Sequence, residues 1–152
     1  MNNNFRKALD FVAKWEGGWS NHPNDRGGKT NYGITEKLYK HYFPTQKIED
    51  CTPEEASAIY RQEFWTPLGC DSMPVALACV VFDSAVQHGP NRARKWLEKT
   101  QNTKEYLELR RHFYYDIIER DHTQSVFKKG WLNRLNDLHK YSDILAAEEG
   151  KP

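Results

Sequence analysis

The stretch VALACVVFDSAV, residues 75–86, decides the fold of this chain of 152 residues because it is apolar nearly all round a helix. A surface helix shows one apolar stripe, whereas a helix that is apolar on every side is buried among other elements. The stretch follows Pro74 and ends before His88-Gly89-Pro90, a sequence that breaks a helix. We therefore predict a central buried helix around which the rest of the chain packs.

Helical patterns lie on both sides of this central segment. Apolar residues recur at helical spacing over residues 4–16, and Thr35 is a helix cap. Thr52-Pro53-Glu54-Glu55 is a strong start signal for a helix that ends near residues 65–67. No internal repeat, linker or low-complexity segment divides the chain, so we expect one mainly α domain over residues 1–152. Further helices are expected at about 91–99, 103–121 and 124–140.

The stretch WEGGWSNHPNDRGGKTNYGIT, residues 15–35, interrupts these helices. Gly17-Gly18 ends the first helix, as glycine after a last turn commonly does. The residues that follow have the composition of loops and of a hairpin. The sequence therefore predicts a small β excursion after the first helix, with Glu16 where the excursion begins.

Glu16, Asp25 and Thr30 place two carboxyl groups and a hydroxyl around this excursion. Glycoside hydrolysis needs one carboxylic acid to protonate the departing oxygen and a second, ionised group to activate water or stabilise the oxocarbenium-like centre. Trp15 and Trp19 flank Glu16 and could supply the apolar surroundings that keep an acid protonated. An exposed helix-end Glu16 and an Asx-turn Asp25 explain the same residues without catalysis, so the residues alone leave both interpretations open.

Residues 16–35 resemble the signature of the N-acetylmuramidases of glycoside hydrolase family 108, within the wider lysozyme-like superfamily. That signature reads E-G-G-[YW] and then N-x-P-x-D-x-G-G-x-T-x-x-G-I-T. FDSAVQHGPNRARKWLEK, from residue 82, is similar to the family's central helix. FYYDIIERDHTQSVFKKGWLNRLNDL, from residue 113, is similar to its peptidoglycan-binding-like half. The resemblance covers about residues 4–140.

The resemblance implies roles for individual residues. Glu16 would be the general acid, while Asp25 and Thr30 occupy places similar to those of the phage-lysozyme Glu/Asp/Thr triad, with one residue fewer before the threonine. Trp19 replaces the commoner tyrosine and could stack on a sugar, and Gln87 stands where many relatives carry asparagine. Carboxyl groups on opposite lips of a cleft favour inverting attack by water, with a separation of about 6.5–9.5 Å. The expected catalytic residues are Glu16, Asp25 and Thr30, and the expected substrate contacts are Trp19, Asn31, Tyr32, Gln87 and His88.

The resemblance also implies a fold and an activity. We expect a lysozyme-like helical domain with its catalytic motif at residues 15–35 and a peptidoglycan-binding-like half at about 74–140. The expected reaction is cleavage of the β-1,4 bond between N-acetylmuramic acid and N-acetylglucosamine in bacterial peptidoglycan, without cofactor or metal. The expected setting is a phage endolysin, or a lytic enzyme delivered by a secretion machine. A lytic transglycosylase using Glu16 alone and a non-catalytic peptidoglycan-binding domain are the alternatives.

Composition argues against several other classes. A net charge of +1 and the lack of a recognition element argue against a nucleic-acid module. The chain has no long apolar run and no signal-peptide core, so we expect no membrane insertion. We expect a monomer that is made in the host bacterial cytoplasm and acts on the cell wall or periplasm after release.

The remaining reactive and aromatic residues have structural interpretations. The six histidines lack metal-site spacing, which argues against zinc amidase chemistry. Cys79 and His88 point in opposite directions on one helix, which argues against a Cys/His peptidase. We expect Cys51, Cys70 and Cys79 to be buried or free thiols. We expect Phe113-Tyr114-Tyr115 and Trp131 in the core, and Arg92, Arg94, Lys95 and Arg134 as solvated charges.

Overall fold

The computed structural model describes residues 3–16 and 30–150. Over these residues the chain is mainly α, as predicted, with one small antiparallel hairpin. Short 3-10 or π turns join several of the helices. The α-helices are α1 (Asn4–Glu16), α2 (Glu36–Tyr42), α3 (Pro53–Tyr60), α4 (Val75–His88), α5 (Pro90–Lys99), α6 (Thr103–Arg120) and α7 (Lys128–Glu149).

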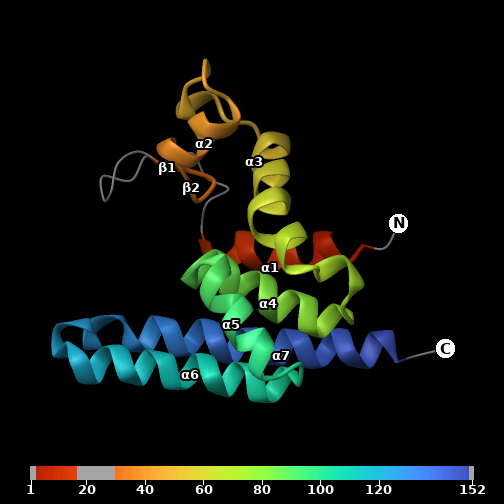
Figure 1. The fold of residues 1–152 in the computed structure, drawn as a ribbon, viewed down its shortest axis with the longest axis vertical. Coiled ribbons are helices and arrows are strands. Elements are labelled where there is room, and N and C mark those ends of the chain that lie inside the picture. Colours follow the sequence, from red (N-terminus) through yellow and green to blue (C-terminus); the bar gives the residue numbers. More distant parts are fainter. Residues whose placement is uncertain (1–2, 17–29, 151–152) are drawn as a thin grey trace.

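Helix α4 is the centre of the molecule, which confirms the prediction from its sequence. Every residue from 75 to 85 is buried. Helices α1, α5, α6 and α7 all pack against α4 (Figure 1). Phe82 lies at the centre of this packing, edge-on to both Phe5 of α1 and Trp65, with ring centroids 5.7 and 5.5 Å apart.

A smaller lobe stands above the helical body, with α3 between the two (Figure 1). It contains β1 (Thr30–Asn31), β2 (Ile34–Thr35), α2 and the 3-10 turn η1 (Ile48–Asp50). The turn residues Tyr32 and Gly33 have φ angles of 52° and 75°. Positive φ at both central residues is the geometry of the two-residue turn that matches strand twist. The predicted β excursion is therefore a minimal hairpin.

The predicted helix starts are confirmed by their caps. Thr35 Oγ1 accepts a hydrogen bond from the Leu38 backbone N–H at the start of α2. Thr52 and Glu55 form a reciprocal capping box at the start of α3. The π turn η2 (Arg61–Trp65) continues α3, so this segment ends where the sequence predicted.

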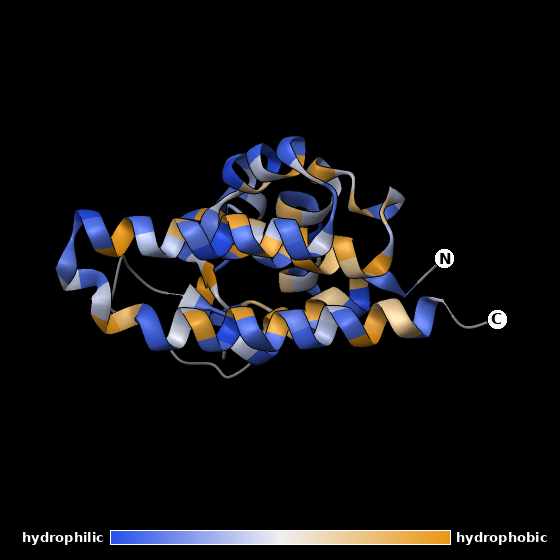
Figure 2. Cartoon of the chain, turned by 90° about the horizontal axis from the view of Figure 1, so that it is seen from below, coloured by the Kyte–Doolittle hydropathy of each residue, from blue (hydrophilic) through white to orange (hydrophobic). Residues whose placement is uncertain are grey.

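Helices α6 and α7 form a long antiparallel hairpin, and Figure 2 shows apolar and polar residues alternating along both. The prediction of a helix over 124–140 was wrong at both ends. The Asp121 carboxylate accepts from Thr123 and starts a 3-10 turn, η5 (His122–Phe127), before α7 begins. At the other end, α7 continues to Glu149 because Ser142 and Leu145 are buried and Tyr141 stacks on Phe11.

The aromatic residues of this hairpin are only partly in the core. Tyr114 is buried and stacks on Trp131 with ring centroids 5.1 Å apart. Phe113 and Trp131 are partly buried against the core, as predicted. Tyr115 is 43% exposed, so its predicted place in the core was wrong. It lies at the next position of α6, where the Lys128 ammonium group at the start of α7 is 5.2 Å from the centre of its ring.

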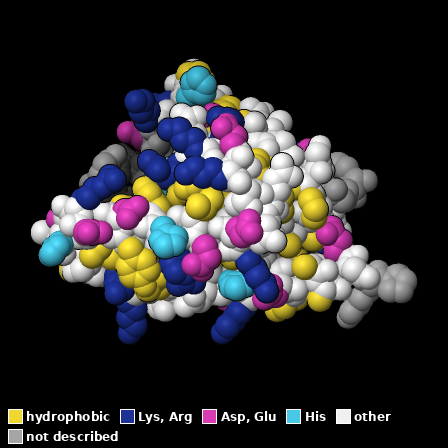
Figure 3. Space-filling view, turned by 60° about the horizontal axis from the view of Figure 1, so that its bottom comes forward, with side chains coloured by type: hydrophobic (Ala, Val, Ile, Leu, Met, Phe, Trp, Pro, Cys, Tyr) yellow, Lys and Arg dark blue, Asp and Glu magenta, His cyan; other side chains and the backbone are white. Residues whose placement is uncertain are grey.

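The three cysteines are buried free thiols, as predicted. Burial raises the pKa of Cys51 to about 11 and that of Cys70 to about 12, so these thiols stay protonated. None of the helices within residues 3–16 and 30–150 combines the length and apolarity needed to cross a membrane. On the face shown in Figure 3, acidic and basic side chains are interspersed.

Candidate active site

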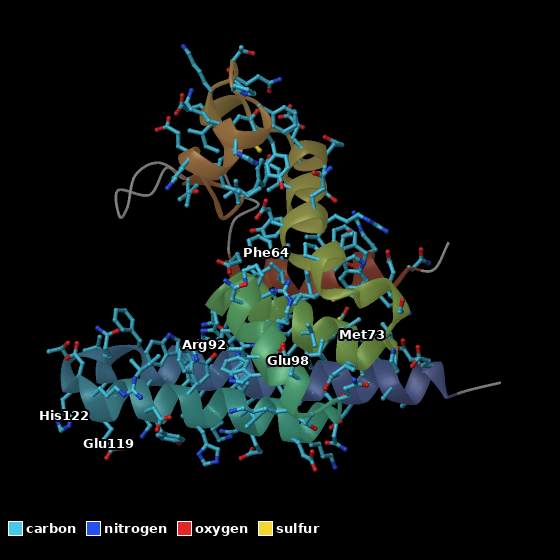
Figure 4. All side chains as sticks on the ribbon, viewed as in Figure 1. Phe64, Met73, Arg92, Glu98, Glu119 and His122 are labelled. Carbon is cyan, nitrogen blue, oxygen red and sulfur yellow. The ribbon has the colours of Figure 1, made fainter. Side chains whose placement is uncertain are left out.

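A cleft of about 430 Å³ lies between the small lobe and the helical body. Both lobes and the end of α1 contribute to its walls. Phe64, from the π turn η2, is found where α3 meets the body (Figure 4). The described residues that line the cleft are Glu16, Gly33, Ile34, Thr35, Leu38, Tyr60, Phe64, Val86, Gln87 and Arg134.

Glu16 is the last residue of α1, and its side chain is 27% exposed to the cleft. Its Oε1 accepts a hydrogen bond from Arg134 Nη1 of α7 at 3.3 Å. That distance is long for a charge-assisted hydrogen bond, which is typically about 2.7–2.9 Å. Glu16 is therefore oriented by Arg134 and still open to a ligand.

Arg134 is held from behind by Asp83 of the central helix. Arg134 Nη2 donates to Asp83 Oδ1 at 2.7 Å, and Nε donates to both carboxylate oxygens at 3.2 Å. Asp83 is 0% exposed and also binds Arg110 Nη1, from α6, at 2.9 Å. Burial works to raise the pKa of Asp83, but the charges of Arg134 and Arg110 outweigh it and lower that pKa. The carboxylate therefore remains ionised.

The neighbouring carboxyl groups keep Arg134 protonated. Burial disfavours its charge, yet Asp83 and Glu16 more than compensate and raise the pKa of Arg134. Glu16, Arg134, Asp83 and Arg110 thus form a chain of alternating charge from the cleft into the core. A buried ion-pair chain of this kind fixes positions, since moving one member leaves its neighbour without a partner.

Tyr60 of α3 joins the small lobe to the floor of the cleft. Its Oη donates to the Tyr32 backbone carbonyl at 2.8 Å. Burial and the nearby charge of Glu16 raise the pKa of Tyr60, so it remains a neutral donor. A Cβ on Gly33 would lie 2.6 Å from Tyr60 Oη and 3.5 Å from Glu16 Cβ. Only glycine fits there, so the hairpin turn can lie directly against Glu16.

Gln87 enters the cleft from the last turn of α4. Its Oε1 accepts hydrogen bonds from Tyr114 Oη at 3.0 Å and from Arg110 Nη2. Next to it, His88 Nε2 lies 3.2 Å from Tyr114 Oη. Burial and the charge of Arg110 lower the pKa of His88 to about 3, so the imidazole is neutral near pH 7.

The structure brings Glu16 and Gln87 together in the cleft, whereas the other predicted site residues that it describes are not part of the cleft lining. Thr30 is partly exposed in β1, outside the cleft lining. Asn31 is 3% exposed, and its Nδ2 donates to the Ile48 carbonyl at 3.1 Å, which ties the hairpin to η1. Tyr32 supplies its carbonyl to Tyr60. Asp25 and Trp19 lie outside the described residues.

Two further residues of this region make their described contacts outside the cleft lining. His88 packs among Trp96, Phe113 and Tyr114, with ring centroids 5.2–5.7 Å away, and does not line the cleft. Trp15, expected beside the acid, donates its indole N–H to Asp137 of α7 at 2.7 Å and fastens the end of α1 there. The substrate contacts of Thr30, Asn31, Tyr32 and His88 stay predictions.

Sequence reasoning missed the residues that hold Glu16. The prediction that Arg134 is a solvated charge was wrong, because it is 7% exposed. The available signal was Asp83, an acidic residue inside an otherwise apolar run, since a buried carboxylate requires a cation. The cation itself lies 51 residues further along the chain. Tyr60 gave no signal of its own.

A carboxyl group held at a helix end, in a cleft between a small hairpin lobe and a helical body, characterises the lysozyme-like glycoside hydrolases. The chain belongs to the glycosyl hydrolase 108 family, whose model matches residues 9–89, just over half of its length. A second family model, described as a predicted peptidoglycan domain, matches residues 84–136. The protein is accordingly a glycoside hydrolase that acts on peptidoglycan.

A solved structure agrees with this assignment. The chain is similar to Brucella abortus SagA, with a TM-score of 0.73 and 26% sequence identity over 93% of this chain and 94% of that one. No curated protein gives a significant match. The two family matches meet on α4, and the cleft draws Glu16 from the first and Arg134 from the second. Both matched regions therefore build one site.

Proposed function

We propose that this protein is an N-acetylmuramidase that hydrolyses the β-1,4 bond between N-acetylmuramic acid and N-acetylglucosamine, with Glu16 as general acid. The observation that carries the proposal is the Glu16 carboxyl group, open to a cleft of about 430 Å³ and oriented by a buried Arg134–Asp83 pair. The family match supplies the reaction class, and the cleft supplies the acid.

Arg134 suits the charge that develops during proton transfer. Among the described residues, Arg134 is the hydrogen-bond partner of Oε1, which leaves Oε2 of Glu16 for the glycosidic oxygen. When the acid gives up its proton, Glu16 gains a negative charge 3.3 Å from a guanidinium. In the protonated form that catalysis requires, Glu16 acquires this charge as the bond breaks, so its interaction with Arg134 is stronger in the transition state than in the bound substrate.

The proposal assigns the attack on the sugar to water. The motif around Asp25 supports a second carboxylate that deprotonates or orients this water, and a wide carboxyl separation would give inversion. The rival is a lytic transglycosylase, in which the sugar's own 6-hydroxyl attacks and leaves a 1,6-anhydro end. Mass spectrometry of muropeptides released from purified peptidoglycan separates the two. Reducing N-acetylmuramic acid ends are expected, and anhydro ends would transfer the assignment to the transglycosylase.

We also propose a biological setting. The enzyme would be made in the cytoplasm of a bacterial host and lyse that host as a phage endolysin, acting as a monomer on the wall after release. A hydrolase and a peptidoglycan match within one chain support this use. Expression in a Gram-negative cytoplasm should lyse cells only when a membrane-permeabilising holin is co-expressed. Equal lysis with and without the holin would contradict release-dependent action.

A further inference from the structure

The Gln87 amide is held in one orientation by the groups behind it. A guanidinium has only donors, so the amide atom that Arg110 Nη2 contacts must be the oxygen. Tyr114 Oη donates to the same oxygen. With Oε1 committed to two donors, the Nε2 amino group lies at the opposite edge of the planar amide.

The neighbouring groups complete this arrangement. Tyr114 Oη accepts from Arg110 Nε at 2.9 Å and lies 3.2 Å from His88 Nε2. Since the Tyr114 proton goes to Gln87, the neutral His88 donates from Nε2. Arg110 also binds Asp83 and Ser84 and is fully buried. The whole network therefore resists a flip of the Gln87 amide.

Gln87 Nε2 has no hydrogen-bond partner among the described residues, and Gln87 lines the cleft. Two other donor side chains of the cleft lining are already engaged. Arg134 is bound to Asp83 and Glu16, and Tyr60 donates to the Tyr32 carbonyl. Gln87 thus presents the cleft with a neutral donor that is fixed in direction.

Apolar side chains surround the same space. Ile34, Leu38, Phe64 and Val86 line the cleft together with Gln87. A ligand group that suits this wall has a strong neutral acceptor next to a small apolar group. An acetamido group has that composition, since its carbonyl is an amide acceptor and its methyl is apolar. A sugar hydroxyl offers the oxygen without the methyl.

We propose that Gln87 is a specificity-determining residue whose Nε2 donates to the N-acetyl carbonyl of a sugar bound in the cleft. The proposal rests on the proposed function, because it takes the glycan of peptidoglycan as the ligand. It adds the group that is recognised and the residue that recognises it. De-N-acetylated glycan would leave the donor without a partner and place an ammonium group beside apolar side chains.

The test compares kcat/KM on peptidoglycan with kcat/KM on the same material after de-N-acetylation. The variant is Gln87→Glu, which keeps an oxygen for Arg110 and Tyr114 and replaces the donor by an acceptor. The ratio of kcat/KM on N-acetylated peptidoglycan to kcat/KM on de-N-acetylated peptidoglycan should be lower in the variant than in wild type by about ten-fold or more. The loss of one specific hydrogen bond implies a change of this size. Damage to the fold would lower both values together and leave the ratio unchanged.

Three controls complete the experiment. Gln101→Glu adds the same charge at an exposed glutamine and should keep the wild-type ratio. Re-acetylated peptidoglycan should restore wild-type activity. Should Gln87→Glu not fold by circular dichroism, Gln87→Met is measured in the same way. An unchanged ratio in the folded variant overturns the role of Gln87, whereas a wild-type enzyme that cleaves neither substrate overturns the proposed function instead.

Discussion

Replacing Asp83 by asparagine should destabilise the protein strongly, although the two side chains have nearly the same shape. The Asp83 side chain is 0% exposed and accepts from Arg134 at 2.7 Å and from Arg110 at 2.9 Å. The substitution leaves two buried guanidinium groups with Glu16 as their remaining described anion. Removing one partner of a buried ion pair costs about 3–5 kcal/mol.

The measurement is the free energy of unfolding from urea titrations followed by circular dichroism, with the slope m checked for two-state behaviour. The matched control is Asp10→Asn, which removes an exposed pair with Arg6 at 3.5 Å, and it should cost less than about 1 kcal/mol. A loss below about 1 kcal/mol in Asp83→Asn would refute the argument that the buried chain of charges needs this carboxylate.

Three further outcomes follow from the site. Gly33→Ala should lower the free energy of unfolding by more than about 1 kcal/mol and lower activity, because φ is 75° and the new Cβ would lie 2.6 Å from Tyr60 Oη. A wild-type free energy of unfolding in urea titrations would contradict this. In the unfolded state His88 takes up a proton below its pKa of 6.5, whereas in the folded state it does so only near pH 3. The free energy of unfolding should therefore decrease as the pH is lowered from 6.5 to about 4, by about 1.4 kcal/mol per pH unit. His88→Asn should reduce that slope, and an unchanged slope would show that other groups cause it. Asp25→Asn should bind peptidoglycan normally while turnover collapses, and near-normal turnover would favour the transglycosylase.

Local patterns were enough to predict most of the helices. The apolar run of α4, the spacing along α1 and the capping box at Thr52 each act within a few residues, so they are visible in the sequence. The length of α7 was missed because its continuation depends on Tyr141 and Leu145 packing against elements distant in the chain. Gly150 is the helix-ending signal in the last part of α7, which ends at Glu149.

The site was predicted less completely. The family motif identified Glu16, and the resemblance pointed to Gln87, both of which line the cleft. Arg134 was interpreted as a solvated charge and Arg110 had no predicted role, because both pair with an Asp83 that is distant in the sequence and leave no local spacing to detect. Asn31 looked available in a polar turn but is buried against η1. Which polar residues face a cleft is set by tertiary packing.

The central claim is that Glu16 supplies the proton that breaks the glycosidic bond. The most direct measurement is the rate at which wild-type and Glu16→Gln enzymes release reducing N-acetylmuramic acid ends from purified peptidoglycan, with folding checked by circular dichroism. Glu98→Gln, at an exposed carboxylate of α5 (Figure 4), is the matched control and should keep the wild-type rate. We expect Glu16→Gln to fold normally and to lose activity by ~10²-fold or more. A folded Glu16→Gln enzyme that releases these ends at near the wild-type rate would contradict the assignment of Glu16.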